Sequence, residues 1–277
     1  MKKISRRSFM AAAAVSVAAL AMTACGGSAS SAASSVASSA ASSETASSAA
    51  AELTTVEAGK LTMATNATFP PYEMTTDSGE IEGIDVDTAK AIAEKLGLEL
   101  QIDDMDFDAA LLSVQQGKAD IVMAGVTVTD ERKAVMDFSD SYATGIQSII
   151  VPEGSDITSP DDLAGKKIGT QRGTTGYIYC SDDFGDDAVV AYDDGLTAVQ
   201  ALKNGQVDAV VIDNAPAKEY VAANPGLVIL DTSYAEEDYA IGMAKGSALE
   251  DAVNAALEEL KADGTLQSIV DKYITAE

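Results

Sequence analysis

The chain has 277 residues, with 18 lysines and arginines against 44 aspartates and glutamates and a net charge of −26. A nucleic-acid surface needs a basic footprint, so this balance argues against a nucleic-acid partner. The absence of histidine excludes Ser-His-Asp and Cys-His catalysis and the commonest metal ligand. The length favours two domains of ordinary size.

Residues 1–24 predict an export signal, because a basic start is followed by an apolar stretch and then by small residues. Met22 to Cys25 resemble the lipobox of bacterial lipoproteins, in which the signal is cut before the cysteine and that cysteine is lipidated. We therefore predict lipidation of Cys25, with ordinary secretion as the alternative. Arg6 and Arg7 also fit a twin-arginine signal, so the export route stays open. No membrane span is expected after the signal.

Residues 25–57 consist mostly of glycine, serine and alanine with scattered acids. Such a segment buries too little apolar surface to fold, so we predict a flexible tether. With lipid on Cys25, it would hold the folded body near a membrane without crossing it. Cys180 would then have no disulfide partner, and we expect it to be a small buried apolar residue.

The body starts near Leu61 and alternates strand-like apolar runs with amphipathic helices. Glycines 97 and 117 end the first two helices. This βαβ order predicts a mostly parallel sheet covered by helices. In this first half, strands are expected at 60–65, 98–103 and 119–126, and helices at 87–97 and 107–117.

A second set of elements follows, and it predicts a second lobe of the same class. Ser159 and Pro160 open a short helix, and Ser247 with Glu250 forms a capping box for the helix at 248–264. We therefore expect two α/β lobes of roughly 90 to 130 residues each. In this half, strands are expected at 166–170, 207–213 and 238–245, and further helices at 196–205 and from Thr265.

Ligands of such sheets bind beyond the carboxyl ends of the strands. The strand at 119–126 ends beside Gly125, Thr127 follows, Thr129 can cap a helix, and Arg132 lies in its first turn. The helix dipole disfavours a cation there, so a bound anion would explain the arginine. Free amide groups and a planar guanidinium suit a small carboxylate. Pairing of Arg132 with a neighbouring acid is the alternative.

Two other strand ends are candidates. The stretch "GTQRGTTG" at 169–176 exposes amide groups at a helix start but lacks the lysine of a Walker loop. Asp213 follows a buried strand and either caps the next helix or binds a cation. Opposed across a cleft, Arg132 and Asp213 would match the carboxylate and the ammonium of a free amino acid.

Several longer stretches of the body are distinctive together, and they include "LTMATNATFPPYEM", "ADIVMAGVTVTDERKAVMDFSDSY", "DLAGKKIGTQRGTTG", "VDAVVIDN" and "LKADGTLQSIVDKY". With these stretches the body resembles the polar amino-acid substrate-binding proteins of ABC importers, which are family 3 extracellular solute-binding proteins. The resemblance implies an α/β, two-lobed, hinged periplasmic-binding fold of type II with the ligand cleft between the lobes. It places chain crossings near 142–146 and 235–239, lobe 1 at 58–144 with 238–277, and lobe 2 at 145–237.

The resemblance also implies which residues bind the α-carboxylate and the α-ammonium that every amino-acid ligand carries. Arg132 would grip the ligand carboxylate, aided by the Thr127 amide and by Thr175. The Gly125 carbonyl, the Thr127 hydroxyl and Asp213 would hold the α-ammonium.

The side-chain end of the pocket is implied by the same resemblance. Phe69 and Phe107 would sandwich the ligand side chain, with Tyr72 nearby and core packing as the alternative for all three. Asn66 and Gln171 are neutral, so they favour an uncharged polar ligand. Glu73 or Asp108 keeps a cationic ligand open.

The expected function is capture of a polar L-amino acid outside the cytoplasm and delivery to a membrane permease, with closure driven by ligand contacts in both lobes. We expect a monomer, lipid-anchored at the outer face of the cell membrane, with neither cofactor nor metal. Acidic clusters are present but lack calcium-loop spacing. The alternatives are a cationic ligand, a carboxylate-based dehydratase on the same fold, and a receptor that reports to a signalling partner.

Overall fold

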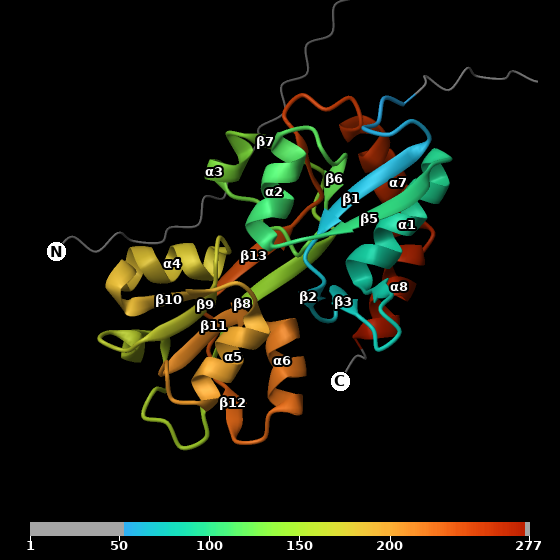
Figure 1. Cartoon of the computed structure of the whole chain (residues 1–277). Helices are drawn as coiled ribbons and strands as arrows, with labels where there is room; N and C mark the ends of the chain where they lie inside the picture. The colour runs from blue at the N-terminus through green and yellow to red at the C-terminus, as the bar shows by residue number, and fades with distance from the viewer. Residues whose placement is uncertain (1–52, 275–277) are drawn as a thin grey trace, which may run out of the picture. The chain divides into compact units, whose positions relative to one another are not determined.

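The structure is a computed structural model that describes residues 53–274 (Figure 1). The predicted signal, Cys25 and the tether up to residue 52 lie outside these residues. Within 53–274, no helix has the length and apolar character needed to cross a membrane. Residues 53–57, which we assigned to the tether, contact the body: the Val56 amide donates to Asp120 at 2.7 Å, and Leu53 packs against the core.

One lobe, here called lobe 1, is built on a five-stranded sheet in the order β5-β1-β6-β14-β7. Strand β1 runs parallel to β5 and β6, whereas β14 is antiparallel to β6 and β7. A small antiparallel sheet, β2-β3-β4, follows β1 in the chain. The strands are β1 Lys60–Thr65, β2 Thr68–Phe69, β3 Glu73–Thr75, β4 Ile81–Glu82, β5 Glu99–Asp104, β6 Ile121–Val122, β7 Met136–Phe138 and β14 Gly242–Ala244.

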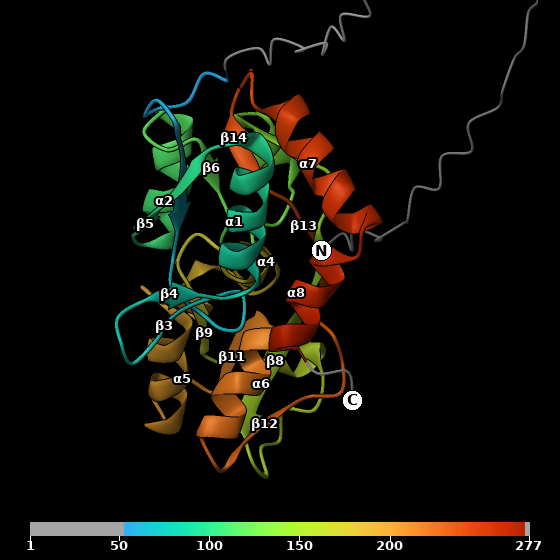
Figure 2. The ribbon, with the colours of Figure 1, turned by 90° about the vertical axis from the view of Figure 1, so that its right-hand side faces the viewer.

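Both faces of the lobe 1 sheet are covered by helices, as the buried strands predict. Leu61 and Met63 face a cluster formed with α1 and α7, whereas Ala64 and Val122 face α2. Figure 2 shows α1 beside α7 and α8 on one side of this lobe. Gly97 ends α1 in the left-handed conformation, with φ 70°. The helices are α1 Ile84–Leu96, α2 Phe107–Gln115, α3 Asp130–Lys133, α7 Glu250–Ala262 and α8 Thr265–Tyr273.

The other lobe, lobe 2, has the sheet order β10-β9-β11-β8-β12, with β13 also paired to β8. Helices α5 and α6 pack on one face of it and α4 on the other. Cys180 of α4 is a free, fully buried thiol, as predicted. The elements are β8 Ala143–Pro152, η1 Pro160–Leu163, β9 Ile168–Gln171, α4 Thr175–Phe184, η2 Asp186–Ala188, β10 Val189–Tyr192, α5 Gly195–Lys203, β11 Ala209–Asp213, α6 Asn214–Ala223, β12 Leu227–Ile229 and β13 Ala235–Tyr239.

Strands β8 and β13 carry the chain between the lobes. They pair antiparallel, with Ala143 opposite Tyr239 and Gln147 opposite Ala235. Figure 1 shows β8 as the long strand that leaves lobe 1, with β13 beside it. These are the segments in which we expected the crossings. The lobe boundaries at 144/145 and 237/238 stay predictions, because the pairing of the two strands continues through both.

Three local predictions were wrong. The expected strand at 238–245 is two strands in different sheets, because its apolar run is buried first in one lobe and then in the other. Helix α7 starts at Glu250 without a side-chain cap, and the Ser247 hydroxyl instead accepts from the Leu249 amide at 3.2 Å. The strand at 119–126 pairs only at Ile121–Val122, because the following residues turn at Gly125, with φ 56°.

Candidate functional site

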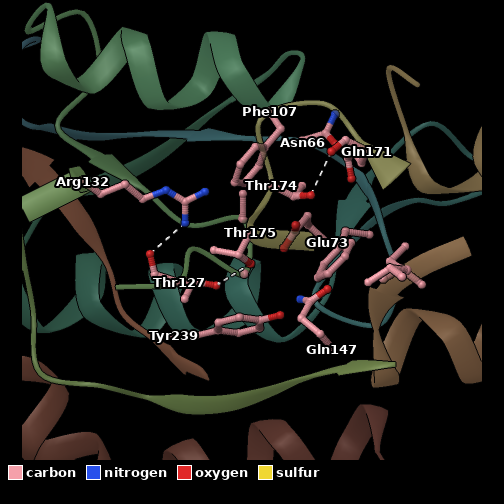
Figure 3. A pocket seen from close by; sticks show the side chains of 15 residues that line it. Asn66, Glu73, Phe107, Thr127, Arg132, Gln147, Gln171, Thr174, Thr175 and Tyr239 are labelled. Atoms are coloured by element: carbon pink, nitrogen blue, oxygen red, sulfur yellow. Dashed lines mark hydrogen bonds between the residues drawn. The ribbon is translucent and has the colours of Figure 1, made fainter. Parts of the chain in front are cut away.

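A pocket lies where the carboxyl ends of β1 and β6 in lobe 1 meet those of β9 and β11 in lobe 2 (Figure 3). Its free volume is about 30 Å³, which suits a water or two but not an amino acid. The lobes therefore have to part to admit a larger ligand. The lining residues are Asn66, Phe69, Glu73, Phe107, Ala124, Gly125, Thr127, Arg132, Gln147, Gln171, Thr174, Thr175, Val211, Ile212 and Tyr239.

Arg132 lies at one end of the pocket, held by backbone groups of both lobes. Its guanidinium donates to the Thr127 carbonyl at 2.8 Å and to the Gly173 carbonyl at 3.1 Å, and it lies over the Phe107 ring at 5.4 Å. The Thr129 hydroxyl caps the short helix that carries it, as predicted. Burial lowers the pKa of Arg132, and the charge of Glu237 opposes this change.

The hydrogen bonds of Arg132 argue against one of its two interpretations, which was pairing with a neighbouring acid. Within the described residues it forms no ion pair with the neighbouring acids Asp130 and Glu131. The hydrogen bonds of its guanidinium go to neutral carbonyls, so within residues 53–274 this buried cation has no directly bonded anion. A carboxylate is the group that such a guanidinium binds best.

The two predicted threonines meet across the lobes. The Thr127 and Thr175 hydroxyl oxygens are 3.4 Å apart, and both lie within hydrogen-bond distance of Glu237 Oε2, at 3.1 and 2.9 Å. The Gln147 side chain donates to the same oxygen at 3.0 Å. Glu237 lies on β13 and is buried among these groups. We did not predict it.

Asp213 is the predicted ligand residue that the structure does not bring to the pocket. Its Oδ1 accepts from the Ala215 amide at 3.0 Å and caps α6, and its Oδ2 accepts from the Ile146 amide at 2.7 Å. Burial raises its pKa to about 6. The helix-cap alternative therefore describes this carboxylate, because amide groups at a helix start need an acceptor.

The opposite end of the pocket holds buried acids. Glu73 is fully buried, and the group within hydrogen-bonding reach of its carboxyl is a second acid, Asp85. Asp85 lies behind it and accepts from the Gly125 amide at 3.0 Å. Burial raises the pKa of Asp85 to about 6, and burial together with the charge of Asp85 raises the pKa of Glu73 well above its usual value.

Asn66 and Gln171 bridge the lobes beside this acidic end. The Gln171 amide donates to Asn66 Oδ1 at 2.8 Å, and the Asn66 amide donates to the Met105 carbonyl at 2.9 Å. Both amides therefore already have protein partners.

The predicted aromatic residues divide between pocket and core. Phe69 and Phe107 line the pocket, whereas Tyr72 lies in the core, stacked on Phe69 at 5.9 Å and edge-on to Tyr239 at 5.4 Å. Among the described residues, no cluster of acids or cysteines is arranged to hold a metal ion.

Of the nine residues that we predicted to bind the ligand, eight meet at this one pocket, although they come from four separate stretches of the chain. What the structure tests is their position, while their roles stay predictions. The eight are Asn66, Phe69, Phe107, Gly125, Thr127, Arg132, Gln171 and Thr175.

Comparison with known proteins agrees with this arrangement. Residues 61–276 match the family described as bacterial extracellular solute-binding proteins, family 3. The probable histidine-binding protein of Neisseria gonorrhoeae is 34% identical over 96% of this chain and 95% of its own. The arginine-binding extracellular protein ArtP of Bacillus subtilis is 34% identical over 79% of this chain and 87% of its own.

A solved structure described as an ancestral arginine-binding protein bound to glutamine superposes with a TM-score of 0.75. It is 44% identical and covers 79% of this chain and 99% of its own. The likeness confirms the predicted α/β, two-lobed fold of the type II periplasmic-binding class. The chain belongs to the bacterial extracellular solute-binding proteins of family 3.

Proposed function

We propose that this protein is the solute-binding component of an ABC importer, which captures a free polar or cationic L-amino acid between its lobes and delivers it to a permease in the membrane. Its relatives are named as binding proteins for histidine and arginine, which indicates a non-enzymatic role. The dehydratase alternative is not favoured.

The observation that carries the proposal is the opposite character of the two pocket ends. At one end a buried guanidinium donates to backbone carbonyls, and at the other Glu73 presents a buried carboxyl whose neighbour is a second acid, Asp85. A carboxylate accepts hydrogen bonds and donates none when ionised. A ligand with an α-carboxylate and a donor-bearing side chain satisfies both ends, so we propose a preference for a cationic side chain.

This preference differs from the uncharged ligand that Asn66 and Gln171 alone favour. Those two amides bond to each other, so part of their hydrogen-bonding capacity is already used. Glu73 lines the pocket with a second acid, Asp85, beside it, so its carboxyl is available to a ligand donor. Ionising this buried carboxyl is costly, and a bound cation would offset that cost.

Calorimetry on the purified full chain tests the proposal against arginine, lysine, histidine, glutamine and cystine. We expect one or a few of these to bind, with a cationic amino acid ahead of glutamine by about tenfold or more, which corresponds to about 1.4 kcal/mol. Absence of binding to every amino acid would contradict the function. Tighter binding of glutamine than of arginine would contradict the cationic preference alone.

A matched pair of variants assigns that preference to one residue. Glu73→Gln should weaken arginine by about tenfold more than glutamine, because it removes a desolvated charge from the pocket. Glu80→Gln lies on the same hairpin but is exposed, and it should leave both ligands unchanged. Equal losses for both ligands in Glu73→Gln would mean that the residue acts on folding instead of selectivity.

We also propose that the signal at 1–24 is removed and that lipidated Cys25 anchors the protein at the outer face of the membrane, where it works as a monomer with its permease. The support is the resemblance of Met22–Cys25 to a lipobox and the tether composition that follows it. Labelling with an alkyne fatty acid should mark the wild-type chain, and Cys25→Ser should abolish both the label and the membrane association. Release of the wild type into the medium would contradict the anchor.

A further inference from the structure

The ring of Tyr239 lies where the ligand pocket meets the strands that cross between the lobes. Tyr239 is the last residue of β13, lines the pocket and is only 1% exposed. Figure 3 shows its ring at the edge of the pocket, beside Thr127 and Gln147. The lobes have to part to admit a ligand, so this ring is packed at a joint between moving parts.

Two glycines form the walls that hold this ring, and we call the space between them the ring slot. A Cβ atom built on Gly145 of β8 would lie 2.5–2.7 Å from Cζ, Cε1 and the hydroxyl oxygen of Tyr239. A Cβ atom built on Gly125 would lie 3.2 Å from Cε2, on the other edge of the ring. Non-bonded carbon atoms pack at about 3.5–4.0 Å, so position 145 has no room for a side chain.

The backbone at Gly145 gives no other reason for a glycine. Its φ lies outside the left-handed region, and it sits in the interior of β8, opposite Glu237 of β13. Glycine is unfavourable in the interior of a strand, because it loses more conformational freedom on folding than alanine does. The Tyr239 ring supplies the reason that the backbone does not.

Tyr239 is attached to lobe 1 by its backbone and reaches lobe 2 with the tip of its ring. It forms an isolated β-bridge with Thr127, and the following amide, of Ala240, donates to the Val126 carbonyl at 3.1 Å. Its hydroxyl lies within hydrogen-bonding reach of Asp213, at the end of β11 in lobe 2. The side chain therefore spans the joint between the lobes, from the loop that lines the pocket in lobe 1.

We propose that the Tyr239 ring is the stop that sets how far the lobes close, which makes Tyr239 a positioning residue for ligand capture. The inference rests on the proposed function. Closure brings β8 against the ring at Gly145, where the ring and the strand fit together only because there is no side chain. A methyl group there would meet the ring before the pocket has closed, because a buried ring in a close-packed site does not move aside. Every ligand would then lose contacts with the second lobe.

Calorimetry on the full chain with Gly145→Ala is the first test. Arginine and glutamine should both bind about tenfold or more weakly, and by the same factor, because overpacking here acts on closure and not on one ligand group. Small-angle X-ray scattering at saturating ligand should give a larger radius of gyration than for the wild type. Thr144→Ala is the matched control, because it changes the neighbouring, exposed residue of β8, and it should leave both affinities unchanged. A folded Gly145→Ala protein that binds like the wild type would overturn the proposal.

A double-variant cycle tests the contact itself. Tyr239→Leu removes the atoms that the added methyl group would meet, namely Cε1, Cζ and the hydroxyl oxygen. Gly145→Ala should therefore cost about tenfold in affinity in the wild type but less than about threefold in the Tyr239→Leu background. Equal costs in both backgrounds would show that position 145 acts through another contact, and the proposal would fall.

A measurement on the wild type keeps the test decisive if these variants do not fold. With tyrosines labelled with carbon-13 at the ε positions, the Tyr239 signals are those missing from the spectrum of Tyr239→Phe. In the closed, ligand-bound protein the two ε carbons face different walls, so slow ring rotation should give two separate signals, which should merge without ligand. The same pattern in both states, merged or separate, would contradict a ring gripped on closure. If the wild type binds no amino acid in calorimetry, the proposed function itself fails, so the two failures are distinct.

Discussion

The two ends of the pocket differ in how their polar groups are satisfied. At the Arg132 end, the guanidinium donates to backbone carbonyls of both lobes, and the hydroxyls of Thr127 and Thr175 bond to the Glu237 carboxylate. At the Glu73 end, a fully buried carboxyl lies beside a second buried acid, Asp85, and its pKa is raised. The first end is organised before any ligand arrives, whereas the second holds a proton that a cationic ligand can replace.

This difference separates what all amino acids share from what distinguishes them. The α-carboxylate and α-ammonium are constant, so a prebuilt network can recognise them with little reorganisation. The side chain varies, and a single buried acid is enough to choose among ligands. Variants at the first end should therefore affect every ligand, and variants at the second end should affect some.

The largest effect is expected for Arg132→Ala. It removes the buried cation of the shared end, so binding of every amino acid should fall by at least about a hundredfold, as expected for a desolvated charge-assisted contact. Isothermal titration with arginine and glutamine measures the loss. Arg172→Ala is the control, because that arginine forms an exposed pair with Asp193 at 3.6 Å. Full-strength binding by Arg132→Ala would contradict the carboxylate assignment.

The pH dependence of binding should be the next largest effect, and it belongs to the Glu73 end. The pKa of Glu73 is raised, so the ligand-free protein holds its proton above pH 4.5, and a cationic ligand requires its release. Affinity for arginine should therefore rise with pH, by up to about tenfold per unit, until the raised pKa is passed. Glutamine should depend on pH less.

The same shifts make the ligand-free fold more stable in mild acid. A raised pKa in the folded state means that folding takes up protons, so this stability is present below the ordinary pKa and lost as pH rises through the folded one. Asp85 and Asp213, both with a pKa of about 6, contribute to the same loss. Glu73→Gln should flatten the arginine profile. An unchanged slope would assign the proton to one of the other acids.

Asp213→Ala should give a smaller effect, on stability. The change removes the cap of α6 and leaves the Ile146 amide without its acceptor, so unfolding should become easier by about 1–3 kcal/mol. Urea denaturation measures this. Discrimination between amino acids and their des-amino analogues should persist. A selective loss of that discrimination, with normal stability, would restore Asp213 to the role that the family resemblance implied.

The sequence predicted the Arg132 end well because its signals are local. A strand end, Gly125, a capping threonine and a glycine-rich helix start lie within short stretches, and the parallel sheets bring the stretches together. Asp213 shows the limit of the same reasoning, since a carboxylate after a strand serves a helix cap and a cation equally well. Only its hydrogen bonds to Ala215 and Ile146 separate the two.

We did not predict Glu237 as a site residue, because its stretch, "AEEDY", has the pattern of solvent-exposed acids. Alternation along the strand was the available signal: Glu236 points out and Glu237 is buried. That signal means little until β13 is known to pair with β8 and to cross between the lobes. We predicted one strand at 238–245 where the structure has parts of β13 and β14, because the periodicity of a sequence does not reveal that the chain passes from one sheet to another.

Tyr220→Phe should give the smallest change, and it provides the baseline for both ends. The Tyr220 hydroxyl of α6 donates to the Thr68 carbonyl of β2 at 2.5 Å, a contact between the lobes that involves no residue lining the pocket. A single net hydrogen bond contributes about 0.5–1.5 kcal/mol, so affinity should fall about two- to tenfold. Because the bond belongs to the closed arrangement and touches no ligand group, the affinities for arginine, glutamine and their des-amino analogues should all fall by the same factor.

Tyr177→Phe is the control, because the Tyr177 hydroxyl makes no hydrogen bond within residues 53–274, and this change should leave the affinities unaltered. A ligand-dependent loss in Tyr220→Phe would mean that closure and side-chain recognition are not separable, and the division of the pocket into a shared and a selective end would fail with it.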